Sequence, residues 1–201
     1  MGRRLGLLGG TFDPVHYGHL IIAQEAASYL ALDEVLFLPA GIQPLKRGLP
    51  ITPAPDRLAM LELAIAGNLR FAVSRAELDR PGVSYTVDTL DRLRAEWGPE
   101  VGFWFIIGED SLANLPAWRD PAGILARTRL AVAPRPSVHV PWPRLEAALP
   151  NLRERIDLVP APLIEISSTD LRARVAAGHP IRYQVPEAVE KYIFAHRIYV
   201  K

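Results

Sequence analysis

The sequence predicts an α/β fold in which a doubly wound parallel sheet carries helices on both faces. Compact apolar runs at 4–9, 34–38 and 101–107 have the pattern of strands that are covered on both sides. The first and third runs end at glycines, and segments with apolar residues at helix spacing separate the runs. In such folds ligands bind beyond the carboxyl ends of the strands, where the strand order reverses, so chemistry-bearing motifs should follow strands.

The expected elements alternate along the chain. The strand at 4–9 leads into a helix that begins at Gly18, and the strand at 34–38 completes a βαβ unit. The later elements, in chain order, are a helix at 55–68, a strand at 70–74, a helix at 86–97, strands at 101–107 and 130–133, an irregular proline-rich connection at 134–150, and closing helices at 168–177 and 187–196.

Composition limits the function classes. The 201 residues fit a single domain over 1–201, with a helical closing segment at about 166–201. With 23 basic and 22 acidic side chains the net charge is +1, so we expect no nucleic-acid or membrane partner, and any phosphate recognition must be local. The absence of cysteine excludes disulfides, thiolate nucleophiles and cysteine-based zinc sites. The short basic start is too brief for a signal peptide, and we expect a cytoplasmic protein.

The segment 9–20, GGTFDPVHYGHL, follows the first strand and places glycines, a threonine and two histidines at one helix entrance. Backbone N–H groups at a helix start point toward a bound anion, and glycines let a ligand approach the backbone closely. His16 and His19 are three residues apart, so both imidazoles can face one ligand. An isolated pair of this kind could equally cap a helix, and only the full string favours a phosphate site.

A second signal lies at 166–172, ISSTDLR, where hydroxyls stand at a predicted helix start. A serine or threonine there often does no more than cap the helix. Three successive hydroxyls with Arg172 one turn further on also make a phosphate cradle, because they combine helix-start amides, hydroxyl donors and a fixed charge.

The two strings together resemble the signature of the nucleotidyltransferase superfamily that shares the HxGH motif. The resemblance implies a Rossmann-like nucleotidyltransferase fold in which both histidines contact the phosphates of ATP. The segment 108–118, GEDSLANLPAW, resembles the part of bacterial nicotinate-nucleotide adenylyltransferases whose glycine and aspartate hold the adenosine half. The ATP-binding residues implied in this way are Gly9, Gly10, Thr11, Phe12, His16, His19, Gly108, Asp110, Ile166, Ser167, Ser168, Thr169 and Arg172.

The same family resemblance implies a pyridine site. Trp118 matches a tryptophan that stacks on the pyridine ring, although it could also simply close the core. The segment 84–90, SYTVDTL, resembles the stretch whose backbone at a helix start receives the nicotinate carboxylate, although a threonine there could be a plain cap. The residues implied for nicotinate mononucleotide are Thr11, Lys46, Tyr85, Thr86, Trp118 and Arg135.

The segment 39–46 departs from the family pattern. It lacks the asparagine and the Pro-Pro-His that commonly precede a basic residue, and it has Ala40 and Leu45 in this stretch. Lys46 aligns with the basic residue, while Arg47 or Arg135 offers an alternative charge. The contacts of this segment to the mononucleotide therefore stay open.

The resemblance implies transfer of the adenylyl group of ATP to nicotinate mononucleotide in NAD biosynthesis, with ATP and the mononucleotide as binding partners. The acceptor phosphate is already anionic, so the protein has to align two anions and spread the developing charge. We expect Mg²⁺ to bind through the ATP phosphates, because no carboxylate cluster in the sequence resembles a protein-only metal site. The expected catalytic residues are His16, His19, Lys46 and Arg172.

Two alternatives remain at this stage. One is an adenylyltransferase that uses nicotinamide mononucleotide or another phosphorylated acceptor such as pantetheine phosphate. The segment 84–90 and Trp118 weigh against an acceptor without a pyridine ring. The other is a nucleotide-binding regulatory module without catalysis, against which the intact histidines and the ISST string weigh. The sequence leaves open the oligomeric state, including a homo-oligomer, and the degree of choice between acid and amide pyridines.

Overall fold

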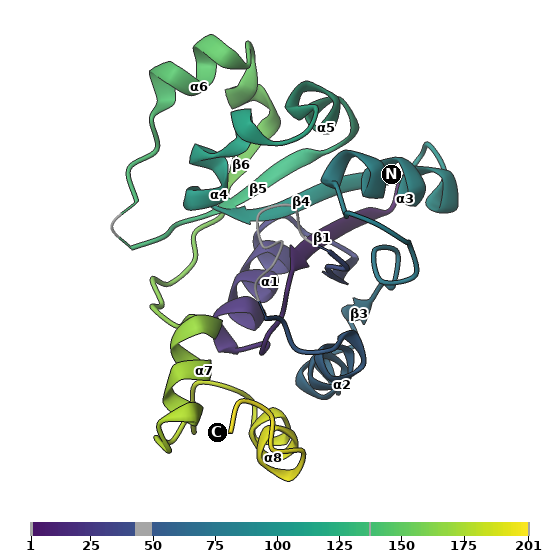
Figure 1. The fold of residues 1–201 in the computed structure, drawn as a ribbon. Coiled ribbons are helices and arrows are strands. Elements are labelled where there is room, and N and C mark those ends of the chain that lie inside the picture. Colours follow the sequence, from purple (N-terminus) through teal and green to yellow (C-terminus); the bar gives the residue numbers. More distant parts are fainter. Residues whose placement is uncertain (1, 43–49, 137, 201) are drawn as a thin grey trace.

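The computed structural model describes residues 2–42, 50–136 and 138–200, and its centre is a six-stranded sheet (Figure 1). The strand order is β3-β2-β1-β4-β5-β6, and every neighbouring pair is parallel. The predicted doubly wound α/β fold of the Rossmann-like type is confirmed. The strands are β1 Arg4–Gly10, β2 Glu34–Pro39, β3 Phe71–Val73, β4 Gly102–Gly108, β5 Arg129–Ala133 and β6 Ile156–Leu158.

Helices cover both faces of the sheet and enclose two hydrophobic cores. Helices α1, α2, α7 and α8 pack into the first core, and α3, α4, α5 and α6 pack into the second. The helices are α1 Tyr17–Tyr29, α2 Ala54–Ile65, α3 Thr86–Trp97, α4 Glu109–Ala113, α5 Pro121–Arg127, α6 Trp142–Ala148, α7 Ser168–Ala176 and α8 Glu187–Ala195, with 3₁₀ turns at Leu115–Ala117 and Leu152–Arg155. Among the described residues, no helix is long and apolar enough to cross a membrane.

The central strands are apolar throughout because consecutive side chains serve opposite cores. In β1, Leu7 packs into the second core and Leu8 into the first. In β4, Ile106 belongs to the first core and Ile107 to the second. Successive side chains of a strand point to opposite faces, so a strand covered on both sides cannot show a polar alternation. This is why the runs at 4–9 and 101–107 read as unbroken apolar sequence.

The strand order reverses between β1 and β4, which fixes where a ligand can bind. β1 pairs with β2 on one side and with β4 on the other, although β2 follows β1 in the chain and β4 comes much later. The loops that leave β1 and β4 therefore diverge to opposite faces and open a crevice at the carboxyl edge of the sheet. Gly10 and Gly108 stand at this edge, at the ends of β1 and β4.

Two sequence expectations for the second half of the chain were incomplete. The connection 134–150 is not wholly irregular, because it contains α6. Pro143 stands in the first turn of this helix, where a missing N–H costs no internal hydrogen bond, and Leu145 is buried. The helices α4 and α5 and the three-residue strand β6 were also missed, since each is too short for its periodicity to register.

We predict that Thr128→Val will lower the free energy of unfolding by about 1–3 kcal/mol. The buried hydroxyl of Thr128 lies 2.8 Å from the carbonyl oxygen of Phe103 and accepts the N–H of Phe105 at 3.1 Å. Valine preserves the volume but leaves that N–H without its acceptor. Urea denaturation should show the loss, while Ser28→Ala, which removes an exposed hydrogen bond from Gln24, should stay within about 0.5 kcal/mol of wild type. Equal stability of both variants would contradict this account.

Candidate active site

The turn that leaves β1 is shaped by close contact between a glycine and an aromatic ring. Phe12 is buried and has a φ of 51°, in the left-handed region. Its ring lies against Gly10, where an added Cβ would come within 3.0 Å of the ring carbons. Gly10 is therefore required by packing at the end of β1, and it brings the chain abruptly toward the start of α1.

The two histidines of the HxGH string lie side by side at the start of α1. Their ring centroids are 3.8 Å apart with 31° between the ring planes, and the N–H of His16 donates to Nδ1 of His19 at 3.3 Å. An added Cβ at Gly18 would come within 3.0 Å of Nδ1 of His16, so a glycine between the histidines leaves room for this pairing. The Phe12 ring packs edge-on against His19 at 5.0 Å. The structure thus brings the two rings together, and their contact with one ligand stays a prediction.

Burial, and to a smaller extent the cation of Arg135, lower the pKa of His16 to about 4. His16 is only 4% exposed, and its Nδ1 has no hydrogen-bond partner among the described residues. At neutral pH the ring is therefore uncharged. A neutral imidazole at a helix N-terminus is suited to a phosphate, because the anion would raise the ring's pKa and could accept a hydrogen bond from a ring N–H.

The ISST segment is fastened to the loop that carries the histidines. Ser167 is the N-cap of α7 and accepts the N–H of Asp170 at 3.0 Å, as a plain capping residue would. Ser168 donates to the carbonyl oxygen of Pro14 at 2.9 Å, and Arg172 donates to that of Asp13 at 2.7 Å. The structure thus brings the two predicted phosphate motifs together although they are more than 150 residues apart in the chain.

The end of β4 carries a third part of the site. Glu109 accepts the backbone N–H of Arg135 at 3.0 Å, and the Arg135 guanidinium lies 3.6 Å from the carboxylate of Asp110. The side chains of Asp110 and Arg135 cover Gly108. An added Cβ at this position would clash with the Asp110 carboxylate and would lie 2.8 Å from Nε of Arg135. Arg135 was expected on the mononucleotide side. Its influence on the pKa of His16 sets it close to the histidines as well.

The residues expected to hold the pyridine gather on the second-core side of the sheet. Tyr85 is the N-cap of α3, and Thr86 is the first residue of that helix. Trp118 packs edge-on against Phe105 with ring centroids 6.1 Å apart, so it is partly a core residue as well. The guanidinium of Arg119, which the sequence reading missed, lies 4.6 Å from the centre of the Tyr85 ring and so links the two segments.

Residues 43–49 lie outside the described residues, and three of them bear on the predicted contacts to the mononucleotide. They are Leu45, Lys46 and Arg47, so the catalytic and mononucleotide-binding role of Lys46 stays a prediction. Ala40 is described and buried. Its N–H donates to the carbonyl oxygen of Gly10 at 2.8 Å.

The sequence reading missed a buried polar cluster beneath the loop after β1. Arg57 donates to the carbonyl oxygens of Thr11 at 2.7 Å and Ala40 at 3.0 Å, while the hydroxyl of Tyr199 donates to the Asp13 carboxylate at 2.6 Å. One signal was available for Arg57. It shares a helix face with apolar residues three, four and eight positions later, and a charge on such a face must find partners. These apolar residues are Met60, Leu61 and Ile65.

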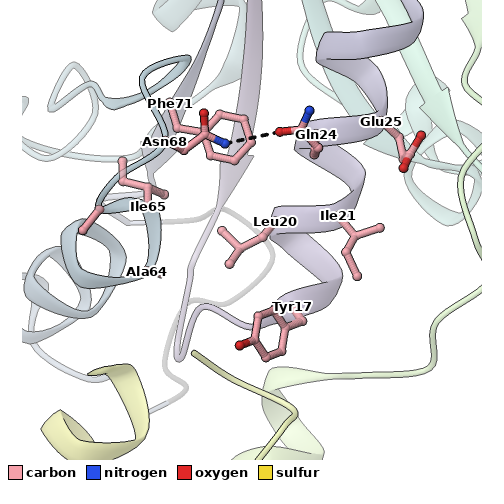
Figure 2. Close-up of a pocket in the computed structure, with 10 residues that line it drawn as sticks. Tyr17, Leu20, Ile21, Gln24, Glu25, Ala64, Ile65, Asn68 and Phe71 are labelled. Carbon is pink, nitrogen blue, oxygen red and sulfur yellow. Dashed lines mark hydrogen bonds between the residues drawn. The ribbon is translucent and has the colours of Figure 1, made fainter. Parts of the chain in front are cut away.

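A cavity of about 280 Å³ lies elsewhere, between α1 and the segment from the end of α2 to the start of β3 (Figure 2). Leu20 and Ile21 line it from α1, Phe71 lines it from β3, and Asn68 donates to Gln24 across it at 3.2 Å. None of the residues predicted to bind substrate lines this cavity. It lies on the flank of α1, and Tyr17 at the start of that helix also lines it.

The fold and the paired helix entrances define the class, that of a nucleotidyltransferase, and the comparison with protein families agrees. The model of the cytidylyltransferase-like family matches residues 7–174. Relatives specify the class further. A probable nicotinate-nucleotide adenylyltransferase of Thermomicrobium roseum is 51% identical over 98% of this chain and 91% of its own length. Another from Roseiflexus sp. is 52% identical over 97% of each chain. The chain belongs to the nicotinate-nucleotide adenylyltransferase family.

Solved structures support the fold. A nicotinic acid mononucleotide adenylyltransferase of Plasmodium falciparum, complexed with NaAD, superposes with a TM-score of 0.79 over 98% of this chain and 97% of its own. A putative nicotinate-nucleotide adenylyltransferase of Vibrio parahaemolyticus gives a TM-score of 0.72 over 98% and 95%. The identities are 17% and 18%, so these matches establish the shared architecture alone.

We predict that His16 titrates near pH 4 in the free protein and at a higher pH when ATP is bound. The ordinary value of 6.5 applies to the unfolded chain, so the protein should lose stability as the pH falls from about 6.5 toward 4. Phosphate charge would favour the protonated ring. NMR titration of the His16 ring signals measures its pKa with and without ATP. Arg135→Met should raise the pKa of His16 in the free protein, because it removes a cation. An ATP-independent pKa would place the phosphates away from His16.

Proposed function

We propose that this chain transfers the adenylyl group of ATP to nicotinate mononucleotide, with deamido-NAD and pyrophosphate as products, as a step of NAD biosynthesis. The observation that carries the proposal is the joining of the two phosphate motifs at the edge where β1 and β4 diverge. The bonds from Ser168 to Pro14 and from Arg172 to Asp13 tie α7 to the histidine loop. The names of relatives 51% and 52% identical support the choice of acceptor.

In the proposed reaction a phosphate oxygen of the mononucleotide attacks the α-phosphorus of ATP. A new phosphorus–oxygen bond forms, the bond from the α-phosphorus to the bridging oxygen breaks, and pyrophosphate leaves with the electron pair. The nucleophile is anionic at neutral pH, so no general base is required. The protein contributes by aligning the two anions in line and by stabilising charge on the leaving group.

The ATP side of the site consists of both helix entrances and the end of β4. His16 and His19 meet the phosphates from α1, while Ser168, Thr169 and Arg172 meet them from α7. Arg135 adds a cation close to His16, as its effect on that pKa indicates. Gly108 and Asp110 lie where the adenosine half would rest on the end of β4. Gly9, Gly10, Thr11, Phe12, Ile166 and Ser167 complete the proposed ATP contacts.

The acceptor side uses the start of α3 together with Trp118. Tyr85 cannot cap α3 with its side chain, and no side-chain cap bond is made there, so the first turn presents its N–H groups to a ligand carboxylate. Arg119 contacts both the Tyr85 ring and the Asp88 carboxylate, the latter at 3.5 Å. Lys46 and Thr11 are proposed to meet the mononucleotide phosphate.

Magnesium is proposed to enter with ATP. Within residues 2–42, 50–136 and 138–200, no three or more histidine, cysteine or acidic side chains cluster in a way that could hold a metal ion. Mg²⁺ keeps several waters and commonly binds through substrate phosphates, where it would neutralise part of their charge. The side chains near the phosphates supply further positive charge through Arg135 and Arg172.

We predict that His19→Ala will lower kcat on the order of a hundredfold while the fold stays intact, because one donor to the developing phosphate charge is lost. Steady-state pyrophosphate release measures kcat, and circular dichroism checks the fold. His179→Ala, which truncates an exposed histidine beyond α7, is the matched control and should keep normal turnover. A normal rate in a well-folded His19→Ala enzyme would remove His19 from the mechanism.

We predict a preference of about tenfold to a hundredfold for nicotinate over nicotinamide mononucleotide. Helix-start N–H groups favour a carboxylate, whereas the amide would set its own NH₂ donors against them. Stacking on Trp118 serves both rings alike, so Trp118→Ala should reduce kcat/KM for both substrates and preserve their ratio.

The measurement is pyrophosphate release from ATP with each mononucleotide and with pantetheine phosphate, for wild type and variant. Equal values of kcat/KM for the two pyridines in wild type would refute the carboxylate site. A ratio that collapses in Trp118→Ala would show that the tryptophan itself discriminates. Turnover with pantetheine phosphate alone would overturn the proposed function.

A further inference from the structure

Arg57 is a fully buried arginine that the proposed reaction does not use. It lies in the first turn of α2 on the face that packs into the first core, and it is 3% exposed. A buried guanidinium is tolerated only where its donors are satisfied. Here three of its nitrogens donate to three main-chain carbonyls, those of Thr11 at 2.7 Å, Ala40 at 3.0 Å and Thr52 at 3.0 Å.

These carbonyls belong to three segments that meet at the carboxyl edge of the sheet. Thr11 follows β1, Ala40 follows β2, and Thr52 precedes α2. In a planar trans peptide the C=O and the next N–H point in opposite directions. When Arg57 holds the carbonyl oxygens of Thr11 and Ala40, it therefore turns the N–H groups of Phe12 and Gly41 away from itself.

Asp13 and Tyr199 complete the surroundings of this guanidinium. Burial lowers the pKa of Arg57, whereas Asp13 and Tyr199 act in the opposite direction. Asp13 also accepts the hydroxyl of Tyr199 at 2.6 Å and the N–H of Thr52 at 3.3 Å. The guanidinium of Arg57 is thus held by the charge of Asp13 and by hydrogen bonds to main-chain carbonyls. Arg172 donates to the carbonyl oxygen of Asp13 in the same loop after β1.

We propose that Arg57 is a positioning residue for adenylyl transfer: it holds the loops after β1 and β2 with their N–H groups turned toward the substrates. The inference rests on the proposed function for its catalytic consequence. Without the guanidinium, the carbonyls of Thr11 and Ala40 can rotate, and a carbonyl oxygen that faces a phosphate repels it. Substrate alignment is sensitive to such shifts, since a displacement of about 1 Å can cost about a hundredfold in rate.

The chain offers a matched control for this role. Arg94, near the end of α3, also donates to three main-chain carbonyls, those of Pro99 at 3.1 Å, Val101 at 2.9 Å and Arg127 at 2.7 Å. These carbonyls stand before β4 and β5, at the amino edge of the sheet and away from the proposed site. The two arginines share their chemistry and differ in location.

The test compares Arg57→Met, Arg57→Lys and Arg94→Met with wild type. We expect kcat/KM to fall about a hundredfold in Arg57→Met and to stay within about threefold of wild type in Arg94→Met, although both variants lose thermal stability. Arg57→Lys keeps the charge without the three-armed fork, so it should fold yet show reduced kcat/KM. Equal losses in the Met variants, or wild-type kcat/KM in Arg57→Lys, would overturn the proposal.

Amide hydrogen exchange on the free proteins separates this inference from the proposed function. Exchange should speed up in both Arg57 variants at Ala40 and Thr52, whose N–H groups are bonded to Gly10 and to the Asp13 carboxylate in the loops that Arg57 holds, and only around 99–102 in Arg94→Met. If wild type released no pyrophosphate with nicotinate mononucleotide, the proposed function would fail, while the exchange pattern and the calorimetric affinity for ATP would still test the positioning role. Unchanged exchange at Ala40 and Thr52 in both Arg57 variants would refute it.

Discussion

The candidate site depends on two hydrogen bonds that join α7, near the C-terminus, to the loop that follows β1. Ser168 and Arg172 donate to the carbonyl oxygens of Pro14 and Asp13, and these bonds hold α7 against the loop after β1. A phosphate that contacts two helix N-termini binds most tightly when both helices are already in place, because ordering them on binding would cost conformational entropy. The same side chains that are proposed to meet ATP therefore also build the frame that receives it.

The positive charge at the candidate site is local, and the protonation state of His16 can change it. The chain as a whole carries +1, yet Arg135 and Arg172 gather at the histidine loop. Burial and Arg135 keep His16 neutral at physiological pH, so the empty site avoids the cost of a further buried cation. A bound phosphate would raise the pKa of His16 and so favour its protonated form. This coupling suits a reaction whose main demand is charge stabilisation on a leaving group.

Local patterns in the sequence were enough to predict most of the sheet and the helix entrances. β1 and β4 are continuous apolar runs that end at glycines, and the HxGH and ISST strings each mark a helix start. What stayed hidden depends on contacts between distant segments. The hydroxyl of Tyr199 bonds to Asp13, 186 positions earlier, and Arg57 joins the two loops that follow β1 and β2. No periodicity in the sequence records either contact. The short helix α6 was missed because its prolines are typical of a loop. A proline is compatible with a helix in its first turn, and that is where Pro143 stands.

The hydrogen bonds of Ala40 explain how the chain tolerates an alanine where it departs from the family pattern. Ala40 contributes its main chain, with the N–H bound to Gly10 and the carbonyl bound to Arg57, and neither bond requires a particular side chain. Its methyl group is 3% exposed and carries no polar atom toward the crevice. An alanine here thus preserves the backbone arrangement but removes any side-chain contact to the mononucleotide. This agrees with the proposed acceptor site, which uses the start of α3 and Trp118, with the cation of Arg119 beside Tyr85.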